Sequence, residues 1–115
     1  MIIRIKNLRL RSILGIYDWE QEKPQDIVIN IEIEFDGNLA AETDRIENTV
    51  DYKTMKKKII NFIENGRFYL IEKLVKEVAD IIMEDEKVTR ATVEIDKPHA
   101  LRFADSVSIE YTAKR

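Results

Sequence analysis

The stretch DIVINIEIEF, residues 26–35, has an apolar side chain at every second position along its whole length. A β-strand turns successive side chains to opposite faces, so this pattern predicts a strand with one buried and one exposed face. The buried face would carry Ile27, Ile29, Ile31, Ile33 and Phe35, and the other face Val28, Asn30, Glu32 and Glu34. The rest of the chain must supply a layer that covers the buried face.

The segment IIRIKNLRLR, residues 2–11, predicts a bent first strand. Its apolar side chains change parity in the middle: Ile3 and Ile5 lie at odd-numbered positions, whereas Leu8 and Leu10 lie at even-numbered positions. An extended chain needs a bulge or twist near Lys6 and Asn7 to bring all four to one face. Gly15 then ends the pattern, and residues 17–25 read as a polar connection to the second strand. We expect these two strands to pair antiparallel.

After Asp36-Gly37 the apolar period changes from two to that of a helix. Residues 51–65 form a first helical stripe, with Gly66 in the region of its C-cap. A second and stronger stripe follows from residue 71 to residue 82. The stripes consist of Met55, Ile59, Phe62 and Ile63, and of Ile71, Leu74, Val75, Val78, Ile81 and Ile82.

Residues 88–96 and 104–114 predict two closing strands, joined through Lys97-Pro98-His99. The order is ββααββ, which predicts an α+β fold with two helices on one face of a four-stranded antiparallel sheet. The other face and both sheet edges stay open in such a subunit, and self-association would protect them.

Composition limits the functions open to the chain. Its 115 residues are enough for one domain, residues 1–115, and the net charge of −3 gives no basic field for nucleic acid. No apolar run is long enough for a membrane span, and we expect a soluble, cytoplasmic protein. With no cysteine and one histidine, the usual zinc ligand sets are missing, so we expect no metal.

Four segments, GIYDWEQ, TVDY, LIEKL and DKPHA, resemble the dihydroneopterin aldolase family in order and spacing. The resemblance covers almost the whole chain. It implies the ββααββ tunnelling fold (T-fold), assembly into a ring as a homo-tetramer or octamer, and a small pterin substrate processed without a cofactor. IIRIKNLRLR, QDIVINI, RFYLIEKL and HALRFADSVS resemble the dihydroneopterin triphosphate 2'-epimerase branch, whereas YDWE and Pro98 resemble the aldolase branch.

The resemblance also implies the pterin-binding residues. Glu72 matches the carboxylate that accepts hydrogen bonds from the 2-amino and N3–H groups of the ring, and Ile71 matches a position that uses backbone groups. A carboxylate suits such a two-donor edge, and the first turn of a helix favours its negative charge. Read without the family, Glu72 is an ordinary first-turn glutamate.

Lys97, Tyr52 and Glu20 match the family's catalytic positions. Lys97 corresponds to the proposed general acid/base that takes the proton of the substrate's 2'-hydroxyl. Tyr52 offers a hydroxyl as donor or acceptor, and Glu20 faces the substrate side chain, so both would also bind substrate. Read alone, Lys97 is a solvated lysine at a strand end, Tyr52 a half-buried packing residue and Glu20 part of a solvated loop.

The implied chemistry is a retro-aldol cleavage of C1'–C2', with the dihydropterin N5=C6 imine accepting the electrons. Release of glycolaldehyde gives the aldolase outcome, and recapture of the aldehyde on its other face gives the 2'-epimer. A triphosphate would need cations, for which Arg102, His99 and Arg67 are the candidates. Two alternatives to the epimerase stay open: a dihydroneopterin aldolase of folate biosynthesis, and a non-catalytic ring module that binds a pterin or purine.

Overall fold

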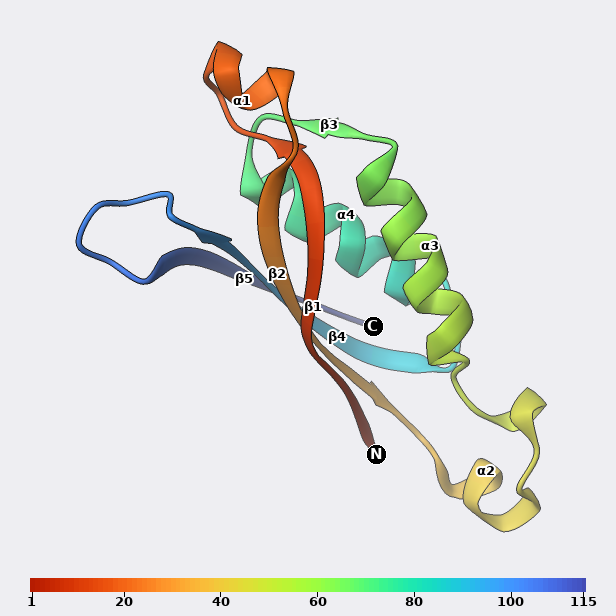
Figure 1. Ribbon diagram of the computed structural model, residues 1–115. Helices are drawn as coiled ribbons and strands as arrows, with labels where there is room; N and C mark the ends of the chain where they lie inside the picture. The colour runs from red at the N-terminus through yellow and green to blue at the C-terminus, as the bar shows by residue number, and fades with distance from the viewer.

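The computed structural model describes residues 1–115 as five strands, four α-helices and one 3-10 helix (Figure 1). The strands are β1 (Ile2–Leu14), β2 (Gln25–Phe35), β3 (Arg67–Phe68), β4 (Val88–Pro98) and β5 (Ser106–Lys114). The helices are α1 (Asp18–Glu22), α2 (Asn38–Thr43), α3 (Tyr52–Glu64) and α4 (Ile71–Met83), and the 3-10 helix η1 spans Ile46–Asn48. None of these helices is long and apolar enough to cross a bilayer.

The sheet has the strand order β3-β1-β2-β4-β5. Its four long strands pair antiparallel as the sequence predicts, and the two long helices follow in the predicted order. The prediction of a purely antiparallel, four-stranded sheet is wrong in one respect, because the short β3 adds a fifth strand parallel to the end of β1. Two residues have too little periodicity to reveal a strand, so no sequence pattern could predict β3.

The predicted bulge in β1 is present. Ile5 lies opposite Ile31 in the register, but the next pair is Leu8 with Ile29, so the two residues between them oppose a single residue of β2. Asn7 adopts a positive φ of 52° there, and its N–H donates to Oδ1 of Asn30 at 2.9 Å. The bulge keeps the apolar side chains on both sides of it against the core.

Helices α3 and α4 cover one face of the sheet, α4 over β4 and β5 and α3 along β1. The four buried isoleucines of β2 lie on this face together with the inner stripes of both helices. The opposite face is polar, as the charged partners Arg4 and Glu32 illustrate. This face and the outer edge of β5 are open in the single chain.

Helix α1 lies in the connection that the sequence predicts to be an irregular polar loop, so that expectation is wrong. A five-residue helix is too short to be stable by itself, and contacts elsewhere in the fold must hold it. Its central residue Glu20 is 5% exposed, although the sequence around it is that of a solvated loop. Figure 1 shows α1 next to β3, at the end of the molecule where β1 ends.

The two glycines at this end have different roles. Gly66 directly follows Asn65, the C-cap of α3, and does not have a positive φ. A Cβ on Gly66 would lie 2.6 Å from the ring of Phe68, so close packing excludes a side chain there. Gly15 has a φ of +145°, which favours glycine, and its N–H donates to the carbonyl of Phe68 at 3.0 Å.

The turn at Gly15 also makes room for the carboxyl group of Glu20. A Cβ on Gly15 would lie 2.1 Å from Cδ of Glu20 and 2.3 Å from both carboxylate oxygens. Any side chain at position 15 would therefore force Glu20 out of its buried position. The glycine is required both for its backbone conformation and for the space above it.

We expect Gly15→Ala to destabilise the fold, by about 1–3 kcal/mol from backbone strain alone and more once Glu20 is displaced. Urea unfolding at neutral pH measures this loss. Gly37→Ala is the matched control: Gly37 has an ordinary φ of −91°, and a new Cβ would meet only the flexible side chain of Met1. Equal losses in the two variants would contradict the role assigned to Gly15.

Candidate functional site

A buried ion pair joins the end of β4 to α1. Nζ of Lys97 donates to Oε2 of Glu20, and the two side chains are 14% and 7% exposed. Six other ion pairs lie at the surface, with both partners well exposed in most of them. The structure thus brings together two residues that the sequence analysis selects, although they are 77 positions apart.

The local fold of α1 holds the Glu20 carboxylate in place. Oε1 accepts the N–H of Tyr17 at 3.2 Å, the contact that a third-position glutamate makes to the cap of its own helix. Burial by itself raises the pKa of Glu20, but the hydrogen bond from Lys97, that from Tyr17 and the charge of Lys97 outweigh it, so the pKa lies below its usual value. Glu20 is therefore a carboxylate at neutral pH, hydrogen-bonded to Nζ of Lys97.

The start of α4 lies at the same end of the molecule. β3 brings Phe68 to Gly15 by a backbone hydrogen bond, and α4 begins three residues later (Figure 1). Ile71 and Glu72 are the first two residues of that helix, Ile71 half-buried and Glu72 exposed. Glu72 makes no ion pair within the chain, so its carboxylate is free to accept donors from outside.

Tyr52 lies at the other end of the molecule from Glu20, Lys97 and Glu72. It is the first residue of α3, and its side chain is 50% exposed. The 13 residues of α3 span about 20 Å, and only the far end of that helix approaches β3. Within one chain, Tyr52 cannot meet a ligand held by Glu72 and Lys97.

The three phosphate candidates are not brought together. Nη1 of Arg67 donates to the backbone carbonyl of Gln21 at 3.0 Å, which places this guanidinium next to α1. Arg102 lies in the exposed connection between β4 and β5 and makes no hydrogen bond within the chain. His99 begins this connection with a positive φ of 65°.

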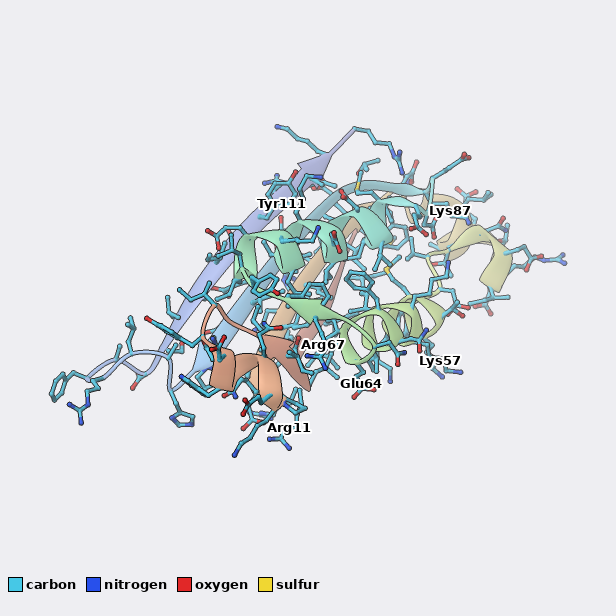
Figure 2. All side chains as sticks on the ribbon, turned by 90° about the horizontal axis from the view of Figure 1, so that it is seen from above. Arg11, Lys57, Glu64, Arg67, Lys87 and Tyr111 are labelled. Atoms are coloured by element: carbon cyan, nitrogen blue, oxygen red, sulfur yellow. The ribbon has the colours of Figure 1, made fainter.

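Sequence reasoning missed two arginines of β1 at this end. Arg9 and Arg11 line a surface cavity of about 420 Å³ together with His99. Arg11 also contacts Asp26, with Nε 3.4 Å from Oδ1, and Figure 2 shows Arg11 and Arg67 next to α1. Their strand position gives no sign that they lie near His99, because that proximity depends on how β4 pairs with β2.

Exposed apolar side chains gather at both ends of the molecule. The end with α1 carries Ile16, Tyr17, Trp19, Tyr69 and Leu70, and the end with α2 carries Met1, Leu39, Ile46 and Tyr52. Each of these nine side chains is at least half exposed. Patches of this kind typically mark contact surfaces.

Comparison with known proteins points to one family. The model of the dihydroneopterin aldolase family (FolB) matches residues 3–112. A dihydroneopterin triphosphate 2'-epimerase of Escherichia coli is 50% identical over 114 residues, which cover 99% of this chain and 95% of the relative. A dihydroneopterin aldolase of Haemophilus influenzae is 32% identical over 105 residues, which cover 91% of this chain and 89% of the relative.

The fold agrees with this match. The crystal structure of E. coli dihydroneopterin aldolase in complex with neopterin superposes with a TM-score of 0.92 at 27% identity, and the superposition covers 98% of each chain. The matched region includes β1, β2 and β4, the start of α4 and both members of the buried ion pair. The sequence, the fold and this coverage together establish that the chain belongs to the dihydroneopterin aldolase family.

Proposed function

We propose that the protein converts 7,8-dihydroneopterin triphosphate to its 2'-epimer by retro-aldol chemistry. One observation carries the chemical part of this proposal: a buried pair, Lys97 with Glu20, lies at the same end of the molecule as the free carboxylate of Glu72 in the first turn of α4. The 50% identity to an enzyme named for this epimerisation, against 32% to an aldolase, favours the epimerase outcome.

Glu72 anchors the pterin ring in this proposal. The ring presents its 2-amino group and N3–H along one edge, and a carboxylate accepts both hydrogen bonds side by side. Glu72 is exposed and lies in the first turn of α4, where the helix dipole adds to the stability of its charge. Backbone groups at Ile71 lie next to it and would contact the same ring.

Lys97 and Glu20 act on the side chain of the substrate. The 2'-hydroxyl enters beside the pair and gives its proton to Nζ of Lys97 in its neutral amine form, and C2' becomes an aldehyde carbon as the C1'–C2' bond breaks. The bonding electrons form a C6=C1' double bond, and N5 takes up a proton. The ring itself thus accepts the electrons. Because the hydrogen bond to Glu20 holds Nζ of Lys97 in place, proton transfer needs no large movement of the protein.

The fate of the aldehyde decides between the two reactions of this family. Its rotation, followed by bond formation on the opposite face, gives the 2'-epimer, and its escape gives the aldolase products. From the triphosphate, the cleaved fragment carries the whole phosphate chain, so cations near the pair would retain it. Arg67 beside α1, and His99 with Arg9 and Arg11, supply positive charge at this end, and Arg102 stays a candidate through its loop.

A complete site requires a second copy of the chain. Tyr52 lies at the far end of α3 from Lys97, and exposed apolar side chains cover both ends. Contact between the α1 end of one copy and the α2 end of the next would bury both patches and bring Tyr52 to the pair. Such a head-to-tail contact generates a ring when its rotation closes, and we propose a tetramer or a pair of stacked rings.

The test of substrate and reaction is direct. Purified protein incubated with 7,8-dihydroneopterin triphosphate should give the 2'-epimer as main product, with kcat/KM at least about tenfold above that for unphosphorylated dihydroneopterin. Chromatography of the products distinguishes the epimer from 6-hydroxymethyl-7,8-dihydropterin. A preference for the unphosphorylated substrate, with glycolaldehyde as product, would instead assign the chain to the aldolase reaction.

Replacing Lys97 separates turnover from binding. Lys97→Met should lower kcat about a hundredfold or more, because a proton-transfer group is lost, with neopterin affinity within severalfold. The variant leaves the Glu20 charge buried and unpaired, at a cost of about 3–5 kcal/mol, so the double variant Glu20→Gln/Lys97→Met serves as its stability control.

Glu72→Gln should have the opposite profile: it should weaken neopterin binding, because the amide offers one acceptor oxygen in place of two. If Lys97→Met abolished binding and Glu72→Gln left it intact, these roles would be wrong.

Complementation tests the shared site. Tyr52→Ala and Lys97→Met should each be inactive alone, whereas co-expressed chains should regain activity at the interfaces that combine a native Tyr52 with a native Lys97. Random mixing makes about a quarter of the interfaces complete, which sets the expected recovery. Light scattering gives the assembly size. A monomer at micromolar concentration, or no recovery from mixed oligomers, would refute the shared site.

A further inference from the structure

The side chain of Gln21 joins the two halves of the site. Its Nε2 donates one hydrogen to the carbonyl of Gly15 at 2.8 Å and the other to the carbonyl of Phe68 at 2.9 Å. Both partners are carbonyl oxygens, so only the amide nitrogen can face them. Gln21 thus bonds the turn before its own helix to Phe68, which lies 47 positions from Gln21 in the sequence.

These bonds belong to one junction. The carbonyl of Phe68 also accepts the N–H of Gly15 at 3.0 Å, and Arg67 donates to the backbone carbonyl of Gln21. The junction therefore fixes the turn before α1 and the helix itself against β3. Gln21 is the residue that takes part on both sides, through its side chain and through its backbone.

Each side of the junction carries one functional group. Glu20 immediately precedes Gln21 in α1, and its carboxylate sits against Gly15. On the other side, Phe68 leads within four residues to Glu72 at the start of α4. The separation between the pair that acts on the side chain and the anchor of the ring depends on how α1 is held against β3.

We infer that Gln21 is a positioning residue that sets the distance between the Glu20–Lys97 pair and the pterin anchor at Glu72. The inference rests on the proposed function, since one substrate must reach both groups at once. A displacement of about 1 Å between reacting groups can lower the rate about a hundredfold. A ligand that occupies only the anchor does not span the junction and is insensitive to such a displacement.

The sequence around Gln21 gives a matched control. The side chain of Gln25, four residues later, donates only to the carbonyl of Lys23, at 3.4 Å, and makes no hydrogen bond to a distant segment. Gln21→Met and Gln25→Met remove the same amide and keep nearly the same side-chain volume. Loss of donors at Gln21 leaves the backbone bond between Gly15 and Phe68 intact, so the fold itself is retained.

The experiment compares kcat and KM for dihydroneopterin triphosphate with the Kd of guanine, whose 2-amino and ring N–H groups mimic the pterin edge. Gln21→Met should lower kcat about 10- to 100-fold, with KM and guanine Kd within about threefold of the wild type, and Gln25→Met should change none of them. Unchanged kcat in Gln21→Met, or a joint loss of kcat, guanine affinity and thermal stability, would overturn the inference.

Hydrogen exchange keeps this test separate from the proposed function. A wild-type protein that turned over neither substrate would refute the proposed reaction but would leave the junction open to measurement. Amides of residues 67–72 should then exchange faster in Gln21→Met than in Gln25→Met, because β3 loses its hydrogen bond to the side chain of Gln21. Equal exchange in the two variants would overturn the positioning role whatever the activity of the wild type.

Discussion

The burial of the Glu20 carboxylate constrains this end of the molecule more than any other single contact. A buried charge without a partner costs several kcal/mol, so the fold must bring an ammonium group to it. Lys97 meets this need from the end of β4, and Gly15 meets the steric need by having no side chain. This pair forms only if the curvature of the sheet, the turn after β1 and the position of α1 together bring Glu20 to Lys97.

The junction at Gln21 extends this constraint to the start of α4. The ion pair fixes α1 against β4, and the amide of Gln21 fixes α1 against β3. Helix α1 therefore contacts both strands that lead to the functional residues, although it has only five residues. A helix this short is not stable by itself, so its position is set by its contacts with β3 and β4.

The sequence predicts those parts of the fold in which one periodic face is buried. Three sequence patterns indicate long buried surfaces, and each is found in the structure: the alternation in residues 26–35, the parity change at Asn7 and the two helical stripes. By contrast, α1 and β3 are held by a few contacts to distant segments, and both are too short to show a periodic pattern. Glu20 illustrates the consequence: its neighbours are polar and solvated, and only the folded chain reveals that it is buried.

The candidate site is predictable to the extent that the family resemblance supplies it. Periodicity gives no reason to select Lys97 or Tyr52, because a strand-end lysine and a helix-start tyrosine are ordinary surface residues. The structure adds the pairing of Lys97 with Glu20, and it separates Tyr52 from both. The resemblance assigns no functional role to Arg9 or Arg11, and only the structure places their positive charge near His99.

In the proposed mechanism the same site serves cleavage and epimerisation, so the difference between the two outcomes must lie in how long the aldehyde stays. Proton transfer and bond breaking at the Lys97–Glu20 pair would be common to both reactions and would not discriminate between them. An aldehyde that carries a triphosphate is retained by cations in proportion to their charge, whereas free glycolaldehyde has only its hydrogen bonds. Under this proposal, the cations around α1 and at the end of β4 would act after bond cleavage, on whether the aldehyde is recaptured or escapes. A subunit with the same pair but fewer cations would then release more aldehyde.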